Sequence, residues 1–197
     1  MILSKKLELH LAAIAAAGAG MAVASESQAA VVSSGPVNIN IPATTSGVYL
    51  NVVTGVSSTS PASAPGWDVN PWSSTTLGLF SPSAPAGGVY TNIAGNYNLP
   101  SGAVVGGGPW GSLSPTALNW NLNSDNNYVG FRFQNETNGN ATHFGYMQIR
   151  IGATITTRSI IAYAYENVAN TNITVPTPGA ASLLAVGAAG LLGRRRK

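Results

Sequence analysis

The chain has no cysteine among its 197 residues, and only 8% of its residues are charged. The absence of cysteine excludes disulfide bonds, thiol nucleophiles and thiolate metal ligands. Residues 30–175 carry few charges and are close to neutral; the charged residues are Arg132, Arg150, Arg158, Asp68, Asp125, Glu136 and Glu166. Three scattered arginines do not make the clustered basic face of a nucleic-acid-binding protein, so no nucleic-acid partner is expected.

Long hydrophobic runs are also missing, and the apolar stretches lie near the two ends. Lys5 and Lys6 precede an apolar stretch over about residues 9–24, and small residues follow it. A charged start, roughly 7–15 apolar residues and a small-x-small exit are typical of a secretory signal peptide, which we predict over residues 1–29. We expect cleavage after Ala29, with Ser27 three positions before the cut. Cleavage after Ala24 and a retained N-terminal anchor are the alternatives.

The other apolar stretch, residues 180–192, is rich in alanine, leucine and glycine. It is shorter than the roughly 20 apolar residues that span a bilayer comfortably, and we predict a short hydrophobic helix. A cluster of four cations ends the chain, and these are Arg194, Arg195, Arg196 and Lys197. Such cations stay on the cytoplasmic side and would stop a translocating chain, so they are the expected membrane-stop residues. A buried core helix and a plain C-terminal anchor are the alternatives.

Residues 175–197 resemble a known sorting signal. The motif Val175, Pro176, Thr177, Pro178 and Gly179, the short apolar helix and the basic end are similar to the PEP-CTERM signal of exported bacterial proteins, although Thr177 stands where the commonest form has glutamate. The resemblance covers only this tail and the signal peptide. It implies processing by signal peptidase and by exosortase, a membrane-embedded transpeptidase-like enzyme, with membrane contact through the helix beforehand. It also implies a final place at the cell surface, in the outer membrane or in the extracellular matrix of a bacterium.

The interior favours strands over helices. Residues 37–41 and 48–52 alternate apolar and polar side chains, which predicts a hairpin. Residues 128–133, 143–151 and 160–166 predict an antiparallel meander, with a turn at Asn138 and Gly139. Proline is frequent over residues 55–115, where short strands near 67–69, 76–80 and 89–93 are expected. We therefore predict an all-β fold, with a single antiparallel β-sandwich or jelly-roll-like domain over 30–166 and a polar spacer over 167–174.

Catalytic chemistry has little support in the sequence. A glycosidase needs two acids close together, and an Asp68–Glu166 pair is the candidate. His143 is the sole histidine of residues 30–175, and no Gly-x-Ser-x-Gly motif accompanies it. We predict no catalytic residues, no enzyme activity and no cofactor, and a structural or adhesive role.

Two binding sites compete with that interpretation. Residues 123–127 are rich in oxygen donors that calcium prefers, but Asp125 is their one charge, so we predict no metal site. Trp67, Trp72 and Trp110 lie in loops rich in proline and glycine. Their rings would either stack on the sugars of an extracellular polysaccharide or cap the core. A carbohydrate-binding module is thus the alternative function.

Overall fold

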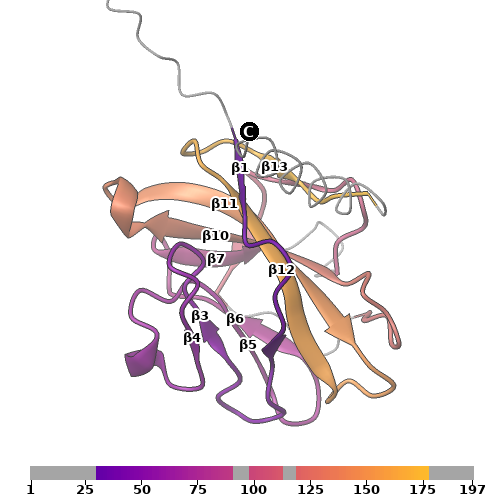
Figure 1. Ribbon diagram of the computed structural model, residues 1–197. Coiled ribbons are helices and arrows are strands. Elements are labelled where there is room, and N and C mark those ends of the chain that lie inside the picture. The colour runs from indigo at the N-terminus through magenta and orange to yellow at the C-terminus, as the bar shows by residue number, and fades with distance from the viewer. Residues whose placement is uncertain (1–29, 91–97, 113–118, 178–197) are drawn as a thin grey trace, which may run out of the picture.

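The computed structural model describes residues 30–90, 98–112 and 119–177, and these residues form an antiparallel all-β fold (Figure 1). One sheet has seven strands, which are β1 (Val31–Ser33), β2 (Ile39–Asn40), β7 (Gly87–Tyr90), β9 (Trp110–Gly111), β10 (Tyr128–Asn135), β11 (Ala141–Ile151) and β12 (Arg158–Glu166). Three two-stranded sheets pair β3 (Tyr49–Leu50) with β4 (Ser57–Ser58), β5 (Asn70–Trp72) with β6 (Gly78–Phe80), and β8 (Val104–Val105) with β13 (Ile173–Thr174). Two short 3-10 turns, η1 (Pro61–Ser63) and η2 (Glu136–Asn138), complete the described elements. The predicted all-β class is confirmed.

Strands β10, β11 and β12 form the predicted meander at the centre of the large sheet. The turn between β10 and β11 contains Gly139, whose φ of +59° suits glycine. Between β11 and β12 the register shifts, because Gln148 pairs with Ala162 while Ile149 pairs with Ile160. The extra residue makes a β-bulge, so Ile160 and Tyr163 both reach the same core although they are three positions apart.

Both faces of this sheet are covered. The larger core joins alternate residues of the meander, such as Phe131 and Met147, to residues of β3 and β6 and their neighbours, such as Leu50 and Leu79. The smaller core lies on the opposite face, where Phe144 and Tyr146 of β11 pack with β8 and β13. Period-2 alternation along β11 is what separates the two sets of side chains.

The predicted hairpin over residues 37–52 is wrong. β2 pairs with β12, where Ile39 lies opposite Ile160, and β3 pairs with β4. The intervening residues 42–47 carry the chain from the edge of the large sheet into the covering layer, and Gly47 adopts a φ of +60° there. The alternation placed Ile41, Val48, Leu50 and Val52 in the core correctly, but it could not specify which strands pair.

The packed domain extends beyond residue 166. Residues 167–174, predicted to be a polar spacer, include β13, and Ile173 of this strand is buried in the smaller core. Val175 is buried there too, with none of its surface exposed. In the proline-rich region, β5, β6 and β7 are short and lie close to the three predicted strands.

Candidate functional site

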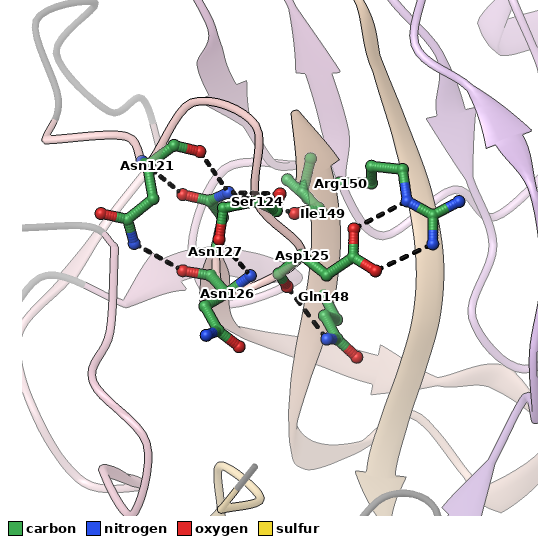
Figure 2. Close-up of polar contacts among 8 residues, drawn as sticks. All are labelled: Asn121, Ser124, Asp125, Asn126, Asn127, Gln148, Ile149 and Arg150. Carbon is green, nitrogen blue, oxygen red and sulfur yellow. Dashed lines mark hydrogen bonds and ion pairs between the residues drawn. The ribbon is translucent and has the colours of Figure 1, made fainter. Parts of the chain in front are cut away.

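The asparagine-rich loop over residues 121–127 is organised by one buried amide (Figure 2). The Asn127 side-chain oxygen accepts hydrogen bonds from the Asn121 N–H at 2.8 Å and from the Asn98 amide at 3.1 Å. Its Nδ2 donates to the carbonyl oxygens of Asn121, Ser124 and Ile149, at 3.0, 3.2 and 3.3 Å. Asn127 therefore supplies from within the chain the cross-links that a bound ion would otherwise provide.

Asp125, the single charge of this loop, is already paired. Its carboxylate accepts two hydrogen bonds from Arg150, at 2.7 Å from Nε and 2.8 Å from the second nitrogen, as Figure 2 shows. The bond to Arg150 is the main cause that lowers the pKa of Asp125. A guanidinium in this position repels a cation. Within the described residues, no group of three or more histidine and acidic side chains is arranged to hold a metal ion.

A different acid, Asp68, is buried. It is 3% exposed, and its Oδ2 accepts from the Val52 N–H at 2.8 Å. Burial is the largest cause that raises its pKa to about 8; the Val52 bond opposes the shift, and the charge of Glu136 adds to it. Glu136 in turn accepts from the Asn51 amide at 3.1 Å. Asp68 thus interacts with Glu136, and the surroundings of Asp68 favour the protonated form of the Asp68 carboxyl.

The predicted alternative of an Asp68–Glu166 pair finds no support in these contacts. Glu166 Oε1 accepts from the backbone nitrogens of Ala30 at 2.7 Å and Val168 at 3.3 Å. His143 is fully buried, with Nδ1 2.7 Å from the Glu166 carbonyl oxygen and Nε2 3.2 Å from the Asn138 amide. Since the Asn138 amide nitrogen can only donate, Nε2 accepts and Nδ1 carries the proton. His143 therefore joins two strands and a turn.

The tryptophans proposed as glycan contacts lie in three different environments. Trp67 is half-buried beside Tyr49, at 5.0 Å between ring centroids, and beside Phe80, at 5.6 Å. Phe80 is 37% exposed, so these three rings form an aromatic cluster at the surface. Sequence reasoning missed Tyr49 and Phe80, although each follows or precedes a buried leucine in its strand and must point the other way.

Trp110 and Trp72 are less available. Trp110 stacks on Phe144, with centroids 5.5 Å apart and planes 9° apart, and the Arg132 guanidinium lies 5.4 Å from its centroid. Its ring is therefore packed against other side chains of the domain. Trp72 is half-buried, and its indole N–H is buried without a hydrogen-bond partner among the described residues. The Trp110 ring serves packing against the smaller core in this structure.

The first residues of the predicted sorting motif are held against the domain. Val175 N–H donates to the Ala103 carbonyl at 2.8 Å, its carbonyl oxygen accepts from Gly102, and the Ser101 hydroxyl donates to the Pro176 carbonyl. Thr177 is the last described residue and is exposed. The remaining motif and membrane-stop residues lie outside the described residues; they are Pro178, Gly179, Arg194, Arg195, Arg196 and Lys197.

Comparison of the chain with protein-family models, curated proteins and solved structures gives no match. The part of the chain that the structure describes contains no helix of the length and apolarity that crossing a membrane requires. The predicted signal peptide and the apolar run 180–192 lie outside that part.

Proposed function

We propose that the protein is an exported bacterial protein of the cell surface or extracellular matrix, sorted by an exosortase, with a structural or adhesive role and no catalysis. The observation that carries this proposal is the order of three parts over residues 175–197: the Pro-containing motif, the short apolar run and the terminal cations. A charged and apolar N-terminus complements them, because cations at both ends stay inside while the neutral region between them crosses the membrane.

The geometry around the motif supports the proposal. Because Val175 is buried and bonded to Ala103, the segment open to a processing enzyme begins near Pro176. In Figure 1, β1 and β13 lie toward the same end of the molecule, as expected if both flanking segments lead to one membrane. We also propose that the domain is a β-sandwich, with the large sheet as one layer and the sheets β3–β4 and β5–β6 as the other.

Intact mass of the exported protein tests the sorting proposal. The full chain should be produced in a bacterium that has an exosortase and in a strain from which that enzyme is deleted. We expect the tail to be absent in the first strain and present in the second. Pro178→Ala, within the motif, should slow removal of the tail, whereas Thr174→Ala, an exposed change in β13, should leave it unchanged. A mature protein that keeps Arg194 to Lys197 in both strains would contradict exosortase processing.

The alternative function, carbohydrate binding, is favoured by the surface cluster of Tyr49, Trp67 and Phe80. Large aromatic side chains offer a broad contact area, and this cluster sits on a surface with few charges. Co-sedimentation with insoluble bacterial polysaccharides measures it. Trp67→Ala should abolish sedimentation if the cluster binds sugar, whereas Val104→Ala, at an exposed site on β8, should not. Equal sedimentation of both variants and the natural protein would remove this alternative.

A further inference from the structure

The backbone nitrogen of Ala30 is surrounded by more acceptors than a peptide N–H can use. It lies 2.7 Å from Glu166 Oε1 and 2.9 Å from the side-chain oxygen of Asn167. A peptide nitrogen has one hydrogen to share between these two oxygens, whereas an α-ammonium has three. Ala30 is also the residue that follows the predicted signal-peptide cleavage site.

The charge of Glu166 makes the same point. Glu166 is only 4% exposed, and its side-chain contacts are backbone nitrogens. Among the described residues, Arg150 and Asp125 form the one ion pair, and no arginine pairs with Glu166. A carboxylate this deeply buried is normally balanced by a positive charge or by several hydrogen bonds. In the uncut chain its partners are neutral.

We propose that cleavage after Ala29 turns the Ala30 nitrogen into an α-ammonium that Glu166 and Asn167 bind as an ion pair. This inference rests on the proposed export. Water adds across the Ala29–Ala30 peptide bond, the C–N bond breaks, Ala29 keeps the carboxylate, and the released amine takes up a proton. The nitrogen then gains two hydrogens and a positive charge without moving from the ladder, because Asn167 N–H already donates to the Ala30 carbonyl.

The consequence is that removal of the signal peptide completes the domain. β1 is an edge strand of three exposed residues that pairs with the C-terminal half of β12. An ion pair at Ala30, the residue just before β1, between an exposed nitrogen and the buried Glu166 carboxylate, holds this edge more strongly than a peptide hydrogen bond does. A start at any other residue would leave the site without its cation.

N-terminal sequencing of the exported full-length product is the first test. We expect the exported protein to begin at Ala30. A product that begins at Met1 contradicts the export proposal itself. A product that begins at Ser25 or at another residue after cleavage leaves export standing and overturns the ion pair.

Amine acetylation then measures the ion pair directly. Residues 30–193 contain no lysine, so the α-amine is the single primary amine of the fully processed chain, and Lys197 falls in a separate peptide if the tail is retained. An ammonium held by Glu166 reacts slowly, because its pKa lies above the usual value of about 7.7–8.0 for an α-amine. Near neutral pH we expect the natural protein to be acetylated about tenfold more slowly than Glu166→Gln, which corresponds to a pKa difference of about one unit.

Asp125→Asn is the matched control, because it removes the same charge from a distant, exposed pair and should react like the natural protein. Equal rates for the natural protein and Glu166→Gln would overturn the ion pair. If Glu166→Gln does not accumulate, the natural protein can be acetylated to completion at high pH and melted beside an untreated sample. Loss of the ammonium should lower its Tm by about 3 °C or more, and an unchanged Tm would overturn the inference.

Discussion

Val175 and Ala103 are joined by a backbone hydrogen bond of 2.8 Å between the end of β13 and the turn before β8. The bond fixes Val175, the first residue of the proposed sorting motif, to the domain, and the Val175 side chain fills part of the smaller core. The domain and the proposed signal therefore overlap by one or two residues. If an exosortase cuts the tail as proposed, it meets a folded surface at the first residues of its motif.

Val175→Ala should destabilise the domain. It removes two buried methyl groups, and at about 0.8 kcal/mol for each we expect a loss of about 1.5 kcal/mol in the free energy of unfolding. Urea unfolding of the exported protein measures the loss. Val104→Ala is the control, because Val104 lies in the neighbouring strand β8 but is 50% exposed. Equal effects of the two changes would show that Val175 is not part of the core.

Arg158 is a second position where a substitution should be costly. The side chain is 4% exposed, and its guanidinium donates to the carbonyl oxygens of Ile41, Pro42, Ser73 and Thr76. Arg158→Ala leaves these carbonyl oxygens without donors. Each one that stays buried lowers the free energy of unfolding by about 1–3 kcal/mol. We expect urea unfolding to show a loss of about 3 kcal/mol or more in the free energy of unfolding. The loss should be smaller for Arg158→Lys, which keeps the charge but not the planar guanidinium and its five N–H donors.

Arg150→Ala is the comparison for Arg158. Arg150 is exposed and belongs to a surface ion pair, so its removal should leave the free energy of unfolding almost unchanged. A loss as large as that of Arg158→Ala would mean that charge, rather than the buried hydrogen bonds, explains the effect.

The central meander could be predicted from the sequence because it depends on local patterns. Alternation over residues 128–133 and 143–151 assigns each side chain to a face, and Asn138 with Gly139 marks the turn. The same reasoning failed for β2 and β3. Their alternation was correct, but their partners, β12 and β4, are decided by packing between distant segments.

The end of the domain and the buried arginine were missed for a similar reason. Ile173 and Val175 are two apolar residues in a polar stretch, too few to establish a period. Arg158 begins a strand, where a charged residue ordinarily faces water, and its burial depends on carbonyl groups more than 80 positions earlier in the chain. Neither the Ala30 site nor the aromatic cluster of Tyr49, Trp67 and Phe80 forms within one segment, so both required the structure.

The buried acid Asp68 predicts an unusual pH dependence. Its pKa is raised from 3.8 to about 8 in the folded protein, chiefly by burial, so the folded state holds this proton more tightly than the unfolded state does. Its contribution to stability is complete below pH 3.8 and is lost as the pH rises toward 8, by at most about 1.4 kcal/mol for each unit. Urea midpoints should therefore fall across this range, and Asp68→Asn should flatten the profile.

Asp125→Asn is the control for the pH profile, with the opposite sign. Its pKa is lowered by Arg150, so its contribution is present at neutral pH and is lost as the pH falls through the lowered value. Removing Asp125 should leave the slope between pH 4 and pH 8 as in the natural protein. A slope that persists in Asp68→Asn would show that another group causes it.

The loop over residues 121–127 distinguishes an amide-organised turn from a calcium site. Asn127→Asp replaces a donor of three hydrogen bonds with a buried oxygen that faces the same carbonyl groups. We expect the free energy of unfolding to fall by about 3 kcal/mol or more at neutral pH, because the negative charge of the buried carboxylate then faces carbonyl oxygens, which are also acceptors. If calcium organised the loop, the added carboxylate would instead be tolerated in excess calcium, since calcium prefers charged oxygen ligands.

Melting the natural protein in excess calcium and in EDTA separates the two cases. Coincident curves are expected, and a higher Tm in calcium would mean that the ion competes successfully with Arg150 for Asp125.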